Sequence, residues 1–185
     1  MNKIKKMSKY TVLIAIIIII LFGLGYRFTG LQAAKNHYGV GKDAELLGQV
    51  KYDWGNVYLF KTDKGPQTII SKRFGLLWRA KVGFHMNNSN DAISVVGWGN
   101  DINCTVYAVQ VTDNNVKYIE IGPEDNRIRK YVDKGNLIIF SWDKSIPWND
   151  FNGKAYSTNG EVIYELRYPR LTSALSQTWL GLGTS

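Results

Sequence analysis

The longest apolar run of the chain lies near its N-terminus. Residues 10–26 carry no charged side chain before Arg27, and most of them are Ile, Leu or Val. At about 1.5 Å per residue, a helix over this stretch is about 26 Å long, which is near the lower limit for crossing a bilayer. The pattern predicts a membrane anchor with Tyr10 and Tyr26 at the two interfaces and Ile16 and Ile20 between them.

The charges around this run predict its orientation. Lys3, Lys5, Lys6 and Lys9 precede it, whereas the basic residues after it are more widely spaced. By the positive-inside rule, the N-terminus is cytoplasmic and the chain from about residue 28 is extracytoplasmic, as in a single-pass protein of the cell membrane. A cleaved signal peptide is the alternative, but the best cleavage site, at residues 31–33, has a bulky leucine at its −3 position. The pattern favours a retained signal-anchor.

Beyond the anchor, the pattern is mostly that of strands. Residues 31–38 predict a short juxtamembrane helix that ends at two nearby glycines. Farther along, Val162, Tyr164 and Leu166 alternate with polar residues, which is typical of a strand with one buried face. Strands are predicted at 57–60, 68–70, 76–78, 93–98, 105–111, 116–121, 137–142 and 162–168.

This spacing predicts a mainly β protein. No amphipathic stretch of ten residues separates the strands, which argues against a parallel sheet with crossover helices. We expect a transmembrane helix and a short juxtamembrane helix, followed by an antiparallel β-meander and a sandwich-like ectodomain. The polar residues 85–91 are the best linker or long loop. The expected divisions are a cytoplasmic tip with the anchor at 1–29, the short helix with the meander at 30–85, the sandwich-like module at 92–170, and a tail at 171–185.

Composition narrows the possible partners. The net charge is +8, but five basic residues flank the anchor, so eighteen basic residues beyond it face fifteen acidic ones. The excess is therefore mostly a feature of topology, and nucleic acid is not an expected partner. With one cysteine and two histidines, the chain predicts no disulfide framework, no metal and no other cofactor.

The residues that could carry catalysis are few. Cys104 enters a predicted strand, where a thiol usually packs as a small apolar group. Asp143 and Asp150 bracket a loop, and a carboxylate pair beside aromatic residues can cleave glycans, although a solvated loop has the same pattern. The sequence predicts a non-catalytic binding or support protein of the cell envelope, with a surface hydrolase as the alternative.

Two features are candidate binding surfaces. Trp148 lies in a polar loop, where its ring could stack on a sugar, whereas the other tryptophans are expected in the core. Lys72, Arg73, Arg79 and Lys81 lie within ten residues around a turn, and they could attract an anionic wall polymer or lipid headgroups. The alternative for these four is an ordinary solvated hairpin.

Five stretches of the ectodomain carry a resemblance to known proteins: Tyr52-Asp53-Trp54-Gly55, residues 57–62, residues 74–80, Lys154-Ala155-Tyr156 and residues 159–164. They resemble a family of uncharacterised membrane-anchored extracytoplasmic proteins of Bacillus-type bacteria. The resemblance implies a Gram-positive cell surface, and it carries no catalytic residue. The partners to expect are then the membrane, an anionic cell-wall polymer or another membrane protein.

Overall fold

The computed structural model describes residues 2–86, 90–133, 135–167 and 178–182. For residues 2–8 and 178 it describes the backbone alone. Strands dominate it. In chain order the elements are α1 (Asn2–Gly23), β1 (Tyr26–Arg27), α2 (Gly30–Lys35), β2 (Glu45–Tyr52), β3 (Gly55–Thr62), β4 (Gly65–Phe74), β5 (Leu77–His85), β6 (Ile93–Asp101), β7 (Cys104–Val111), β8 (Tyr118–Gly122), β9 (Ile128–Tyr131), β10 (Leu137–Trp142), a 3-10 turn (Trp148–Asp150), β11 (Asn152–Tyr156), β12 (Val162–Arg167) and β13 (Thr178–Gly181).

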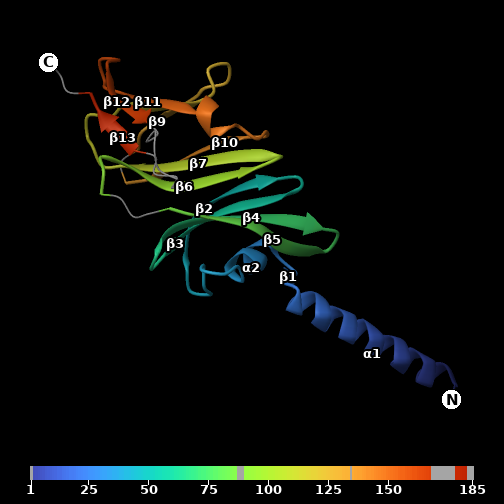
Figure 1. Ribbon diagram of the computed structural model, residues 1–185. Coiled ribbons are helices and arrows are strands. Elements are labelled where there is room, and N and C mark those ends of the chain that lie inside the picture. The colour runs from blue at the N-terminus through green and yellow to red at the C-terminus, as the bar shows by residue number, and fades with distance from the viewer. Residues whose placement is uncertain (1, 87–89, 134, 168–177, 183–185) are drawn as a thin grey trace.

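The strands form three antiparallel sheets that lie in layers (Figure 1). Sheet A has the order β1-β5-β4-β3-β2, sheet B the order β10-β7-β6, and sheet C the order β13-β12-β11-β8-β9. Helix α2 covers the outer face of sheet A, where Ala34 packs with Phe60 and Ile69. The layers therefore follow one another as α2, sheet A, sheet B and sheet C.

Sheet B is covered on both faces, which explains why its strands are apolar at nearly every position. On β7, Val106 packs toward Val57 and Ile70 of sheet A. The next residue, Tyr107, belongs to the large core shared with sheet C. Successive side chains of a strand point to opposite faces, so alternate residues of β7 serve two separate cores.

The mainly β, antiparallel, sandwich-like class predicted from the sequence is confirmed. The predicted helix at 31–38 corresponds to α2, whose start is capped by the Thr29 hydroxyl accepting from the Gln32 amide. Strand β2 was not predicted, because a bulge between Leu46 and Gly48 interrupts its alternation. Strands β9, β11 and β13 are short and were also missed.

Two predicted segments extend beyond the described residues. Residues 87–89 of the expected linker lie outside them, and so does most of the expected tail. Within the described part of that tail, β13 pairs with β12, and Trp179 lies opposite Leu166. The C-terminal segment thus adds an edge strand to sheet C. The division into a meander and a sandwich-like module stays a prediction.

Helix α1 projects away from the layered sheets (Figure 1). The helix ends at Gly23. Gly25 then has a φ of 87° and turns the chain, so that Tyr26 lies in β1 and not in the helix. Tyr26 pairs with Arg79 of β5 there. Among the described residues, no helix has both the length and the apolarity needed to cross a membrane.

Gly55 lies where two strands approach closely. A Cβ atom at this position would be 2.4 Å from the carbonyl oxygen of Ser71, which is backbone and cannot swing away. We therefore expect Gly55→Ala to lower the free energy of unfolding by about 1–3 kcal/mol, as overpacking does. Denaturant unfolding of the full chain in detergent measures this. Gly181→Ala is the matched control, because its Cβ would meet Tyr164 at an ordinary 3.4 Å, and equal losses for the two variants would contradict the account.

Candidate functional site

Three tyrosines stand side by side on the outer face of sheet C. Tyr118 of β8 is in register with Tyr131 of β9 and with Tyr156 of β11. The rings of Tyr118 and Tyr156 are nearly parallel, and their centroids are 4.6 Å apart. The ring centroids of Tyr118 and Tyr131 are 5.8 Å apart. Tyr131 is 65% exposed. We call these three residues the tyrosine row.

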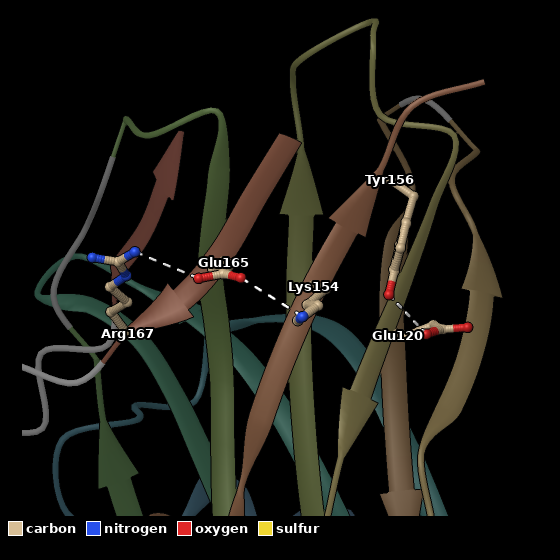
Figure 2. Close-up of polar contacts among 5 residues, drawn as sticks. All are labelled: Glu120, Lys154, Tyr156, Glu165 and Arg167. Carbon is tan, nitrogen blue, oxygen red and sulfur yellow. Dashed lines mark hydrogen bonds and ion pairs between the residues drawn. The ribbon is translucent and has the colours of Figure 1, made fainter. Parts of the chain in front are cut away.

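A row of side chains with alternating charge crosses the same face, two residues away from the tyrosine row on each strand that carries a tyrosine. Glu120 is in register with Arg129 on one side and Lys154 on the other, and Lys154 is in register with Glu165. The Arg129 Nη2 atom is 2.6 Å from Glu120 Oε1, and the Lys154 Nζ atom is 3.7 Å from Glu165 Oε1. We call Arg129, Glu120, Lys154 and Glu165 the charged row. Figure 2 shows its second half, where Arg167 also contacts Glu165.

The two rows are joined through Glu120. The Tyr156 hydroxyl donates to Glu120 Oε2 at 3.1 Å (Figure 2), while Arg129 donates to the other oxygen of the same carboxylate. Burial is the largest cause that raises the pKa of Tyr156, and the hydrogen bond to Glu120 is the second. The Tyr156 hydroxyl is therefore protonated and a donor at neutral pH. The Arg129 guanidinium also lies over the Tyr118 ring, 4.6 Å from its centroid. These contacts hold the rings and charges of the face in fixed positions.

The local sequence explains why these side chains face outward. Ile119 and Ile121 are fully buried against sheet B, so the residues between and beside them on β8 must point to the opposite face. Each of the three strands carries a tyrosine and a charged residue two positions apart, which places both on one face. This spacing, Tyr118-x-Glu120 and its two counterparts, places a tyrosine and a charge on one face of each strand, but it does not show which strands are neighbours.

The four residues of the predicted basic cluster lie on the hairpin of β4 and β5, but Lys72 and Arg73 are consecutive on β4, so their side chains point to opposite faces of sheet A. Lys72 and Arg79 are in register there, and β1 pairs with the same part of β5. Lys72 is already engaged, because its Nζ atom is 2.9 Å from Asp101 Oδ2 and lies over the Trp54 ring. Arg79 lies over the Tyr26 ring, Lys81 lies over the Phe74 ring, and Arg73 donates to the Gly75 carbonyl. All four basic residues therefore already make contacts within the protein.

Trp148 and the carboxylate pair are placed separately from the tyrosine row. Trp148 is in the 3-10 turn and is 57% exposed. Asp143 lines an open cavity of about 530 Å³ together with Asp53, and Asp150 is not among the residues lining it. The structure thus does not unite Asp143 and Asp150 in this cavity. Instead it brings Asp53 to Asp143, beside the stacked rings of Tyr52 and Trp54.

Cys104 is fully buried in the core between sheets A and B. Burial, together with the nearby charge of Asp101, raises the pKa of its thiol from 9.0 to about 12. A neutral thiol is a poor nucleophile, so this environment fits the packing role and not the catalytic one. Among the described residues, no group of three or more His, Cys, Asp or Glu side chains is placed to hold a metal ion.

The Cys104 thiol should therefore be unreactive in the folded chain. At neutral pH we expect iodoacetamide to label it only after denaturation, and Cys104→Ser to lower stability by about 1–3 kcal/mol. Because the folded-state pKa is raised, the stability from the neutral thiol is complete below about pH 9 and is lost as the pH rises toward 12. Rapid labelling of the native protein, followed by loss of binding, would overturn this interpretation.

Comparison with known proteins adds no relative: no protein-family model, curated protein or solved structure matches this chain.

Proposed function

We propose that the protein is a membrane-anchored, non-catalytic binding protein of the cell envelope, and that its ligand is an extended glycan lying on the outer face of sheet C. The observation that carries the proposal is the tyrosine row. In this row Tyr131 is 65% exposed beside the half-buried rings of Tyr118 and Tyr156, and the neighbouring positions of the sheet face are occupied by charged hydrogen-bonding groups.

The chemistry of the face suits a sugar polymer. Aromatic rings bind the apolar faces of sugar rings, and carboxylate, ammonium and guanidinium groups hydrogen-bond to hydroxyl and amide groups. The charged row contains two cations and two anions, so it offers no net attraction to a polyanion. The charged row crosses four of the five strands of sheet C, which suits a ligand that is long and extended rather than small and compact.

The anchor proposal rests on α1. Its side chains from Tyr10 to Ile20 are exposed, with Ile16 at 48% and Ile20 at 55%. Apolar surface of this extent is costly in water and favourable in lipid. The lysines before it and the resemblance to membrane-anchored Gram-positive proteins support an extracytoplasmic position for the sheets. Sheet C is the layer farthest from α2, so its outer face points away from that end of the molecule (Figure 1).

Co-sedimentation of the full chain in detergent with insoluble wall glycan tests the proposal. We expect binding to glycan that has been stripped of phosphate-rich wall polymers, and weak dependence on salt, because stacking is not screened. Binding only to the unstripped material, with a steep fall as salt increases, would instead assign the ligand to the basic hairpin. No binding to either preparation would refute the proposal.

A surface hydrolase is the second candidate, favoured by the cavity that Asp53 and Asp143 share with two stacked aromatic rings. Carboxylates beside aromatic residues are the usual arrangement for glycoside cleavage. The same glycan preparation distinguishes the two candidates. Release of reducing ends by the wild type, abolished in both Asp53→Asn and Asp143→Asn, would establish the hydrolase, whereas binding without release supports the non-catalytic role.

A further inference from the structure

A pocket of about 390 Å³ lies at the junction between α1 and α2. Three cationic residues line it, and none of the described residues lining it is acidic. Two phenylalanines and neutral polar side chains complete the wall. The lining includes Arg27, Lys35, Lys42, Asn36, Phe22 and Phe28.

Arg27 is held in a fixed position at the centre of this junction. Its Nη1 atom donates to the carbonyl oxygens of Phe22, at 2.8 Å, and Tyr26, at 2.6 Å. Its Nη2 atom donates to Asn36 Oδ1 at 2.7 Å. These bonds use three of the five N–H groups of a guanidinium, which leaves two N–H donors without a partner among the described residues.

The two lysines add mobile charge around this fixed one. The Lys35 Nζ atom donates to the backbone carbonyl of Lys42 at 2.9 Å, which uses one of its three protons. The Lys42 side chain itself is exposed. A guanidinium with two amines nearby is a common arrangement for binding phosphate, because the guanidinium supplies directed hydrogen bonds and the amines supply charge.

The aromatic wall indicates the depth at which the pocket would lie. Phe22 and Phe28 contact each other edge to face, with centroids 5.1 Å apart, and Phe28 is 58% exposed. Helix α1 ends at Gly23, so its uncharged part, residues 10–23, is about 21 Å long, and the pocket around Arg27 lies at its end. With α1 anchored in the membrane, this places the pocket at the level of the lipid headgroups.

We propose that this pocket binds the phosphate group of an anionic phospholipid in the outer leaflet, with its acyl chains along α1. The proposal rests on the anchoring part of the proposed function and is independent of the glycan face. Charge complementarity and continuity with the exposed apolar surface of α1 favour a lipid phosphate over free phosphate. Bound lipid would fix the orientation of the layered sheets above the membrane.

Native mass spectrometry of the full chain in detergent, with phosphatidylglycerol and phosphatidylcholine supplied in equal amounts, tests this proposal. We expect preferential retention of phosphatidylglycerol. Arg27→Gln combined with Lys35→Gln should weaken it about tenfold or more, since each near-surface charge contributes about 1 kcal/mol. Lys42→Gln should weaken it by a smaller factor without disturbing the fold, because its backbone carbonyl, which Lys35 contacts, is unchanged.

Lys64→Gln is the matched control, since Lys64 is an exposed lysine at the turn between β3 and β4. Equal retention of the two lipids, or unchanged retention in both the double variant and Lys42→Gln, would overturn the proposal. Displacement of the lipid by inorganic phosphate would show a general phosphate site and overturn the lipid assignment. Carbonate extraction of the chain from phosphatidylcholine vesicles tests anchoring separately, so a failure of the anchor is distinguishable from a failure of the pocket.

Discussion

Phe151→Ala is expected to lower the free energy of unfolding by about 3–5 kcal/mol, one of the largest effects of a single substitution in this chain. Phe151 is 1% exposed. Its ring centroid lies 5.1 Å from those of Trp98 and Tyr107, and 5.3 Å from that of Trp142. These three partners belong to the three strands of sheet B, so truncating Phe151 opens a cavity where the loop before β11 meets that sheet.

Denaturant unfolding of the full chain in detergent, followed by tryptophan fluorescence, measures this loss. Trp148→Ala is the control, because Trp148 lies three residues away and is 57% exposed. The control should cost less than about 1 kcal/mol, as substitutions at exposed positions usually do. A loss at Trp148 as large as that at Phe151 would mean that the core between sheets B and C is assigned incorrectly.

The second large effect concerns the anchor. Ile16 and Ile20 are four residues apart, so they lie on the same face of α1. Replacing both with aspartate should release the chain from the membrane, because each carboxylate costs about 2.5–3.5 kcal/mol at the centre of a spanning helix. The measurement is the fraction of full-length chain that resists carbonate extraction.

Ile16→Leu with Ile20→Leu is the conservative control, and it should stay in the membrane fraction as the wild type does. Protease added to intact protoplasts should degrade the sheets of the wild type. Wild-type chain that is extracted by carbonate, or a mature form that begins near Ala34 in the medium, would contradict the anchor.

Strands such as β6, β7, β10 and β12 could be predicted because each of them carries its own local pattern, whereas β2, β9, β11 and β13 were missed. On β12, Leu166 is buried between two more exposed neighbours, as alternation predicts. Strands β6 and β7 were visible as apolar runs, but the run alone does not reveal what covers each face. That depends on how three sheets stack, which is set by contacts between residues far apart in the chain, such as Val57 with Val106.

The same difference between local patterns and contacts across the chain explains which candidate sites could be predicted. Lys72 and Arg79 could be placed together from the sequence, because a single turn joins their strands. The tyrosine row could not, because β8 pairs with both β9 and β11, and the order of strands in sheet C is not written in any local pattern. The ion pair between Lys72 and Asp101 was missed for the same reason, since it joins sheet A to sheet B.

The most direct test of the central claim compares two aromatic substitutions in one binding assay. Tyr131→Ala removes the most exposed ring of the tyrosine row, and Trp148→Ala removes the exposed ring that the sequence favoured. Tyr38→Ala, at a residue 92% exposed and outside sheet C, is the control. If the glycan lies on the outer face of sheet C, Tyr131→Ala should weaken binding of the full chain to stripped wall glycan about tenfold or more, while the other two leave it nearly unchanged. Loss of binding in Trp148→Ala, with binding retained in Tyr131→Ala, would contradict the account.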